Sequence, residues 1–220
     1  MSETSLFQGT FFDYLMQQEP LCSTEYFAHG SSAMLFQRDG KLYRLTLDGC
    51  GYNFLVEESA RENPNVMRII HDYGAVAPSD TDTLAMGECY WLAEVEWLHD
   101  LDTEDATTQR LQALLAELTG DEPIIEEPDL PALVERCHVL AEQHPEFAAL
   151  LHTLAKAAGF GGDADVHISN IMCRTSTGEL VWSDPLYGTM HHVKEYQLAR
   201  LEALRQSVGK RQLLPAAPAQ

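Results

Sequence analysis

Runs of apolar residues separated by short polar turns occupy the first half of the chain. They predict strands within residues 27–36, 41–47, 64–74 and 88–98, the first range folding back on itself at a small-residue turn. Residues 53–62 instead have the apolar spacing of a short helix. We therefore expect an antiparallel five-stranded sheet and one helix in this half.

Helical spacing dominates the second half. The predicted helices cover residues 103–118, 133–142, 146–158 and 193–205. Pro145 separates the second of these from the third, because proline interrupts the hydrogen bonding of a helix. Two short apolar runs, residues 171–174 and 180–182, flank a polar turn that contains Gly178 and predict a β-hairpin. The predicted fold class is α+β.

Three polar side chains flank the predicted hairpin. Asn170 stands at its entry, Asp184 follows its second strand, and Asp165 comes shortly before Asn170. Because strands joined by a tight turn lie side by side, Asn170 and Asp184 are expected to share one ion. A carboxylate and a side-chain amide offer the oxygen ligands that Mg²⁺ prefers, and phosphates and water complete its shell. Asp165 is then expected to orient and deprotonate an attacking hydroxyl.

Each of these residues taken alone is more typical of a turn, because Asp and Asn side chains bond to nearby backbone. Their order, with a hairpin between them, favours phosphoryl transfer from ATP. His167, inside the same loop, is expected to brace it by hydrogen bonds rather than to act in catalysis.

The stretch D-V-H-I-S-N-I-M at residues 165–172, followed by S-D-P at residues 183–185, resembles the motifs of the protein-kinase-like superfamily. It is most similar to the variant found in aminoglycoside-phosphotransferase-like kinases and in short phage-encoded serine/threonine kinases. The resemblance covers residues 161–187. Two departures are Asp163, where the superfamily has His, and Pro185-Leu186 in place of Phe-Gly. Proline fixes its own φ, so this segment is expected to be stiff.

The resemblance implies a bilobal fold. The sheet and its helix would form an N-lobe at residues 1–98, and residues 99–208 a reduced, mainly helical C-lobe with an acidic insert at 100–131. Residues 209–220 are expected to form a flexible tail. After Asp184 only 36 residues remain (220 − 184), and no A-P-E motif occurs. Substrate selection would therefore depend on another segment, such as the acidic insert.

The resemblance also implies nucleotide-binding residues in the N-lobe. The phosphate-covering loop would be Gly30-Ser31-Ser32-Ala33, and the phosphate-gripping cation would be Arg44, where a compact Lys is usual. Lys41 is an alternative to Arg44. A further alternative is that Arg44 is a surface charge on the outer face of its strand.

Two pairs of glutamates complete the implied site. Glu57 or Glu58, on the predicted helix, would form an ion pair with the cation, and Glu58 is favoured. Glu94 and Glu96 lie in the strand whose end would be the hinge between the lobes, where backbone groups would hold adenine.

Acidic residues outnumber basic ones by 34 to 14, which gives a net charge of −20. Such a chain is repelled by nucleic-acid phosphates and by anionic membranes, so we expect it to bind neither directly. No apolar run reaches the length of about 18 residues that a membrane-spanning helix needs. The first residues lack the features of a secretory signal, and five widely spaced cysteines without a C-x-x-C pair suit a reducing cytoplasm.

The sequence thus predicts a kinase-like phosphotransferase that uses ATP and Mg²⁺. The resemblance suggests a serine or threonine of a host protein as acceptor during phage infection, and the host cytoplasm as location; an aminoglycoside-like small molecule is an open alternative. The acidic charge of the chain suits a basic acceptor of either sort. A rival from another class is a catalytically impaired pseudokinase whose acidic surface occupies a basic site on a host nucleic-acid enzyme. The oligomeric state is not predicted.

Overall fold

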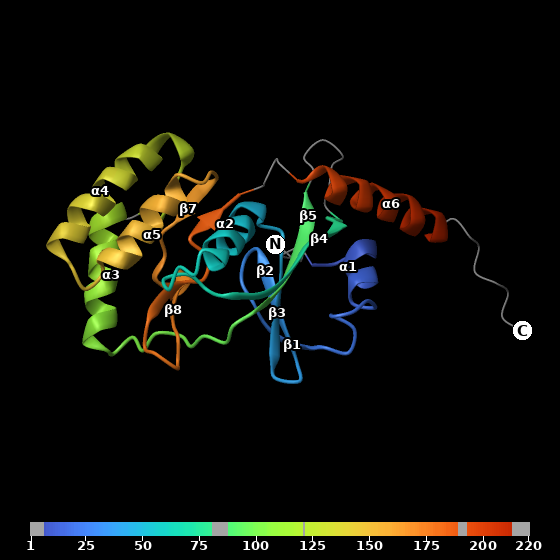
Figure 1. Cartoon of the computed structure of the whole chain (residues 1–220), viewed down its shortest axis with the longest axis horizontal. Coiled ribbons are helices and arrows are strands. Elements are labelled where there is room, and N and C mark those ends of the chain that lie inside the picture. Colours follow the sequence, from blue (N-terminus) through green and yellow to red (C-terminus); the bar gives the residue numbers. More distant parts are fainter. Residues whose placement is uncertain (1–6, 81–87, 121, 189–192, 213–220) are drawn as a thin grey trace, which may run out of the picture. The chain divides into compact units, whose positions relative to one another are not determined.

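The computed structural model describes residues 7–80, 88–120, 122–188 and 193–212, with side chains up to residue 208. The strands are β1 (Glu25–His29), β2 (Ala33–Arg38), β3 (Lys41–Thr46), β4 (Ile69–Pro78), β5 (Cys89–Val95), β6 (Ile124–Ile125), β7 (Asp163–Asp165), β8 (Ile171–Cys173), β9 (Leu180–Trp182) and β10 (Leu186–Tyr187). The α-helices are α1 (Thr10–Leu15), α2 (Gly49–Ala60), α3 (Ala106–Thr119), α4 (Leu130–Gln143), α5 (Ala148–Ala158) and α6 (Glu195–Gln212). Figure 1 shows these elements in order.

The described residues fall into two compact units. The first contains those of 1–47, 73–93 and 190–220, and the second those of 48–72 and 94–189. The lobes at residues 1–98 and 99–208 are implied by the motif resemblance alone, and these units do not test them. The lobe boundaries and the bilobal arrangement therefore stay predictions.

The five-stranded sheet confirms the strand prediction for the first half of the chain. Its order is β1-β2-β3-β5-β4. The strands β1, β2 and β3 are consecutive antiparallel hairpins, with His29 opposite Met34 and Arg38 opposite Lys41. Residues 64–68, predicted as part of a strand, precede β4, which begins only at Ile69.

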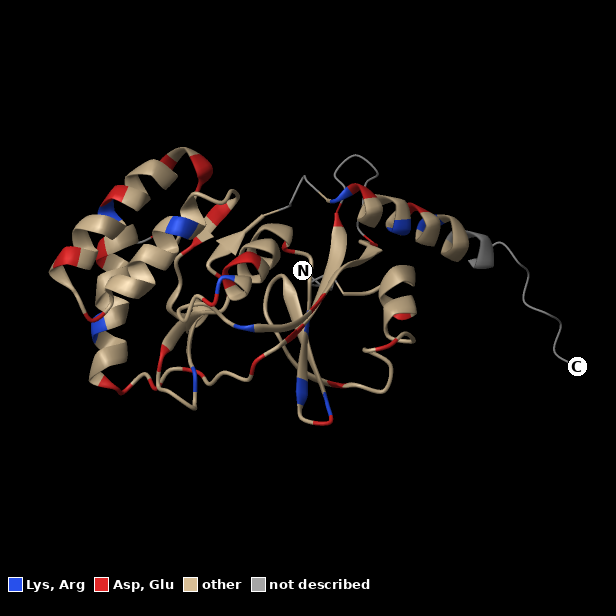
Figure 2. Ribbon diagram, in the orientation of Figure 1, with Lys and Arg blue, Asp and Glu red and all other residues tan. Residues whose placement is uncertain are grey.

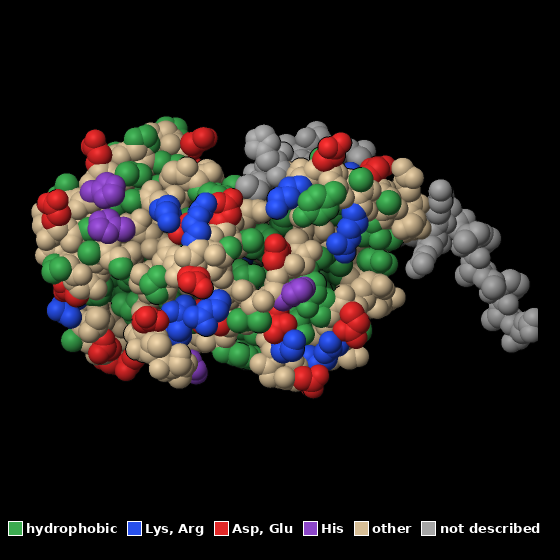
Figure 3. Space-filling view, in the orientation of Figure 1, with side chains coloured by type: hydrophobic (Ala, Val, Ile, Leu, Met, Phe, Trp, Pro, Cys, Tyr) green, Lys and Arg blue, Asp and Glu red, His purple; other side chains and the backbone are tan. Residues whose placement is uncertain are grey.

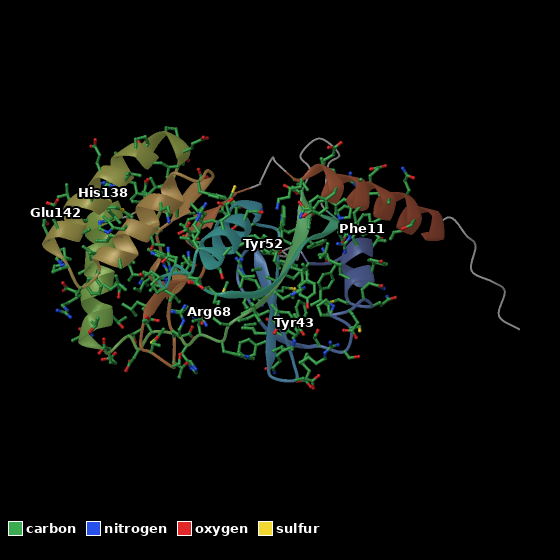
Figure 4. All side chains as sticks on the ribbon, in the orientation of Figure 1. Phe11, Tyr43, Tyr52, Arg68, His138 and Glu142 are labelled. Carbon is green, nitrogen blue, oxygen red and sulfur yellow. The ribbon has the colours of Figure 1, made fainter. Side chains whose placement is uncertain are left out.

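Helix α1 packs on the core of the first unit and was not predicted. Its aromatic residues Phe11, Phe12 and Tyr14 lie against a cluster of buried residues from the sheet that includes Tyr43 (Figure 4). The carboxylate of Asp80 accepts hydrogen bonds from the amides of Phe11 and Phe12, at 2.8 and 2.9 Å. A six-residue helix has too few turns to give a periodic signal, and its N-terminal amides are satisfied by a residue far away in sequence.

Helices α3, α4 and α5 form the core of the second unit, and this confirms the helical prediction (Figure 1). Their buried positions include Leu118, Leu133 and Leu154, each fully buried. Asp105 caps α3 by accepting hydrogen bonds from the amides of Thr107 and Thr108. The break between α4 and α5 falls at residues 144–147, around the predicted Pro145.

Two small sheets complete the second unit. Strands β8 and β9 form the predicted hairpin, and β7 lies between β6 and β10 in a separate sheet. Strands of two or three residues carry no periodicity, so β6, β7 and β10 were missed. The strand β6 belongs to the acidic insert, so the end of this insert is tied into the sheet that carries Asp165.

Two helix boundaries differ from prediction by more than three residues. Helix α2 begins at Gly49 rather than residue 53, because Asp48 caps it. Helix α6 extends to Gln212, so its last four residues lie where a tail was expected, and residues 213–220 lie outside the described part. None of the helices in the described ranges is both long and apolar enough to cross a membrane.

Candidate functional site

The hairpin of β8 and β9 brings Asn170 next to the residue that precedes Asp184. Ile171 is opposite Trp182 in the antiparallel register, so Asn170 and Ser183 lie just beyond the last pair. The Ser183 amide and hydroxyl both donate to the Asn170 carbonyl oxygen, at 2.8 and 3.1 Å. The hairpin therefore has Asn170 at its entry and Asp184 just after its exit, as the sequence predicted.

Asp165 reaches the same place through the other small sheet. It is the last residue of β7, and its amide donates to the carbonyl oxygen of Pro185 at 3.0 Å. The side-chain nitrogen Nδ2 of Asn170 donates to the carbonyl oxygen of Asp165 at 3.2 Å. Asp184 is thus flanked by two residues, Ser183 and Pro185, that each bond to the loop carrying Asp165 and Asn170.

The turn between Asp165 and Asn170 is held by His167. The amide of Ser169 donates to Nδ1 of His167 at 3.2 Å, and the Ser169 hydroxyl lies 2.6 Å from the same atom. Residues 168–170 form a single 3₁₀ turn that follows this cap. The predicted bracing role of His167 is confirmed.

Backbone groups and the side chains of His167, Asn170 and Ser183 form the hydrogen bonds that hold this loop, but some side-chain oxygens take no part in them. Among the described residues, none donates a hydrogen bond to Oδ1 of Asn170 or to the Asp165 carboxylate, and both residues are half-buried. No group of three or more His, Cys, Asp and Glu within the described ranges is placed to hold a metal ion. An amide and a carboxylate oxygen fit a Mg²⁺ that takes its other ligands from phosphates and water.

The first turn of α2 packs against the Asp184 segment, and the sequence reasoning missed this contact. A Cβ on Gly51 would lie 2.1 Å from Oδ2 of Asp48, 2.9 Å from Oδ1 of Asp184 and 3.0 Å from the carbonyl oxygen of Leu186. Only glycine fits such a position. Asp48 accepts hydrogen bonds from the amides of Gly51 and Gly188, at 3.0 and 3.1 Å. The sequence feature that could have predicted this contact is Asp48 followed by Gly49-Cys50-Gly51: a helix-capping residue and then a glycine that allows another segment to approach the helix closely.

The thiol of Cys50 lies inside this packing. A Cβ on Gly162 would be 3.1 Å from its sulfur, and one on Gly188 would be 3.4 Å from it. Burial, with the nearby Asp48 and Asp163, raises the pKa of Cys50 to about 11. The thiol is therefore neutral at physiological pH and packs as a small apolar group.

Glu58 is buried and bound by residues of its own unit. Its carboxylate accepts hydrogen bonds from Nζ of Lys156 at 2.8 Å, from Nδ2 of Asn63 at 2.9 Å and from the guanidinium of Arg61. Burial acts to raise the pKa of Glu58, but these hydrogen bonds outweigh it and the pKa is lowered. Glu57 is exposed and pairs with Arg61. The structure thus gives Glu58 a structural role that was not predicted.

The two hinge glutamates differ. Glu94 lies near the end of β5 and is buried. Glu96 follows β5, and its carboxylate receives two hydrogen bonds from Arg174, at 2.8 and 2.9 Å, and one from the amide of Arg68 at 2.7 Å. The amide of Glu96 itself donates to the carbonyl oxygen of Arg68, a residue labelled in Figure 4.

The remaining predicted residues belong to the first unit. Gly30 and Ala33 close a turn between β1 and β2, with the Gly30 amide donating to the Ala33 carbonyl oxygen at 2.9 Å. Ser31 is exposed, whereas Ser32 is buried and its carbonyl oxygen accepts from the Thr46 hydroxyl. Arg44 lies in β3 and is 5% exposed, so the alternative of a surface charge is wrong. Its pairing with Glu58 and its action with Asp165 stay predictions.

Comparisons with known proteins leave the family open. No family model matches the sequence, and no curated protein matches it. Among solved structures, the chain has similarity to the structure of the streptomycin-ATP-APH(2")-IIa ternary complex, at 12% identity over 81% of this chain and 73% of that chain. The TM-score of 0.30 is too low to establish a common fold.

Proposed function

We propose that this protein is a phosphotransferase that uses ATP and Mg²⁺. The observation that supports the proposal is the pair of backbone contacts around Asp184, through which Ser183 bonds to Asn170 and Pro185 bonds to Asp165. These contacts join the backbone segments that carry three side chains suited to phosphoryl transfer, and this supports a common site for them.

Each residue has a distinct role in this proposal. Asn170 and Asp184 hold Mg²⁺, which when bound with ATP offsets charge on the phosphates. Asp165 accepts the proton of the acceptor hydroxyl and orients it. Arg44 grips the phosphates, with Glu58 as its brace.

We further propose that the acceptor is a serine or threonine of a host protein, encountered in the host cytoplasm during phage infection. A chain of net charge −20 attracts basic partners, and this favours a basic acceptor. On the face shown in Figure 3, acidic side chains are spread among apolar and other polar ones.

The test is transfer of labelled γ-phosphate from ATP in a host-cell lysate, with Asp165→Asn and Asp184→Asn as variants. We expect labelling by the wild-type protein and a loss of about 10²–10⁴-fold in rate for Asp165→Asn, the range for a positioned general base. Equal labelling by wild type and both variants would show that these residues do not carry the reaction.

A pseudokinase that blocks a host nucleic-acid enzyme is the second candidate. It is favoured by Arg44, because a forked guanidinium stands where a compact ammonium is usual. A thermal-shift titration separates the two, since a ligand stabilises the folded protein by RT ln(1 + [L]/Kd). Stabilisation by ATP with Mg²⁺ supports the enzyme. No stabilisation at millimolar ATP, together with salt-sensitive binding to a basic host protein, supports the pseudokinase.

A further inference from the structure

A cavity of about 790 Å³ opens in the second unit, at the turn end of the β8–β9 hairpin. Its lining comes from Asn65 and from three segments that are distant from one another in sequence: residues 99–110, residues 146–150 and the hairpin turn. Leu101, Phe147, Leu150 and Leu180 give it apolar walls. A cavity of this size accommodates several side chains of a bound segment.

Charged residues at this cavity are mostly acidic. Five acidic side chains and one arginine line it, which sums to −4: Asp100, Asp102, Asp105, Glu146 and Glu179, with Arg110. Figure 2 shows the concentration of acidic residues before the start of α3. We call this cavity and its lining the acidic groove.

The acidic groups of this groove are not equally available. Asp105 caps α3. Glu146 and Glu179 form ion pairs, with 3.5 Å between Oε1 of Glu146 and Nη1 of Arg110 and 2.7 Å between Oε2 of Glu179 and Nη1 of Arg174. Asp100 and Asp102 are exposed, and neither forms an ion pair with another described residue. From the described part of the chain, the Asp102 side chain receives one hydrogen bond, from the amide of Glu104 at 3.0 Å. These two carboxylates therefore remain able to pair with an incoming cation.

We propose that the acidic groove docks a basic segment of the acceptor protein, one in which lysines or arginines flank apolar residues. The apolar walls would bury the apolar side chains, and Asp100 and Asp102 would pair with the cations. That the docked protein is the phosphate acceptor rests on the function proposed above, whereas the docking itself does not.

The hairpin fixes the separation between groove and site. Asn170 and Ser183 stand at one end of β8 and β9, and the groove residues Cys173 and Leu180 stand at the other. Each strand has three residues that rise about 3.3 Å each, so the ends are about 10 Å apart. The acceptor hydroxyl is thus expected at least about three extended residues away from the docked segment.

The first experiment measures binding without nucleotide. A fluorescent peptide in which lysines flank a pair of leucines is titrated with the protein, and anisotropy gives Kd. We expect Asp100→Asn with Asp102→Asn to weaken binding about three- to tenfold, since exposed ion pairs are individually weak. Ala149→Tyr, at an exposed position lining the groove, should also weaken it by filling space without changing charge.

Matched controls separate the groove from the charge of the whole chain. Glu135→Gln with Glu142→Gln removes the same charge from exposed positions on α4 that do not line the groove. This double variant should bind the peptide as the wild type does. A peptide with serines in place of the leucines should bind more weakly, because it cannot use the apolar walls.

Two results would overturn the docking proposal. One is equal weakening by both double variants, which would mean that only the overall charge attracts the peptide. The other is unchanged binding by the serine peptide or by Ala149→Tyr. Peptide binding does not test the proposed function, because Asp184→Asn should bind the peptide whether or not the protein is an enzyme. The proposed function fails if the wild-type protein binds a peptide that carries a serine but transfers no phosphate to it.

Discussion

The two ends of the β8–β9 hairpin are both polar, but they use their polar groups in opposite ways. At the turn end, Arg174 is 5% exposed and its guanidinium bonds to Glu96, to Glu179 and to the carbonyl oxygens of Pro64 and Val66. At the open end, backbone groups and the side chains of His167, Asn170 and Ser183 hold the loop, but the Asp165 carboxylate and Oδ1 of Asn170 receive no hydrogen bond from the described residues.

The difference distinguishes a structural polar cluster from a candidate reactive one. Buried charges are expensive unless every group is paired, and Arg174 meets that condition with four partners. The hydrogen bonds that the Arg174 guanidinium donates to Glu96 and Glu179 raise the pKa of Arg174, so it stays charged. Residues left with unused acceptors are available to a ligand, and this is expected where binding or catalysis takes place.

The largest expected effect is on activity at the open end. Asp184→Asn should lower the rate of phosphate transfer by about 10³-fold or more, which corresponds to about 4 kcal/mol of transition-state stabilisation. A urea titration on the same variant should show a fold that is still intact. A variant that transfers phosphate at the wild-type rate would remove Asp184 from the site.

The largest expected effect on stability is at the turn end. Arg174→Ala leaves Glu96, whose side chain is only 11% exposed, without its main partner, so we expect the free energy of unfolding to fall by about 3–5 kcal/mol. Urea denaturation followed by far-UV circular dichroism measures it. Ser169→Ala, at the other end of the hairpin, removes only the hydroxyl contact with Nδ1 of His167; it is the comparison and should cost about 1 kcal/mol or less. Similar losses for both variants would contradict the contrast between the ends.

Glu58 gives a pH-dependent effect of intermediate size. Its pKa in the folded protein lies below the ordinary value of 4.5, so its contribution to stability is fully present above that pH. The contribution is lost as the pH falls through the lowered pKa. Glu58→Gln should therefore lose less stability on acidification than the wild type. The measurement is the unfolding midpoint in urea between pH 6 and 3, a range of about one to two units around the ordinary carboxyl pKa. If the unfolding midpoints of the two proteins fell equally with pH, the lowered pKa of Glu58 would have no role in stability.

The smallest effect is expected at Gly30. A Cβ there would meet nothing within 4 Å, so Gly30→Ala should change the free energy of unfolding by no more than about 0.5 kcal/mol. Thermal unfolding checks this. If the loop covers phosphates as predicted, the same variant should raise the KM for ATP, and an unchanged KM would leave Gly30 as a turn residue alone.

The elements that could be predicted from the sequence are those whose signals lie within a few neighbouring residues. The order of Asp165, Asn170 and Asp184 around two apolar runs predicted a hairpin of the observed polarity, because turn residues and alternation act over a few positions. The helices of the second unit followed from their apolar spacing for the same reason. By contrast, α1 and the two-residue strands β6 and β10 give no signal at their length.

The partners of Glu58 show why the rest could not be predicted. The sequence placed this glutamate on a helix facing a cation, but Lys156 is distant in the chain and reaches it only once α2 and α5 have packed. Tyr52 of α2, which donates a hydrogen bond to Asp72, is a second such contact (Figure 4). The sequence therefore determined which segments are strands, helices and turns, and which side chains carry suitable chemistry. Packing assigned each charged group its partner, because burial makes an unpaired charge costly and selects whichever counter-charge lies within reach.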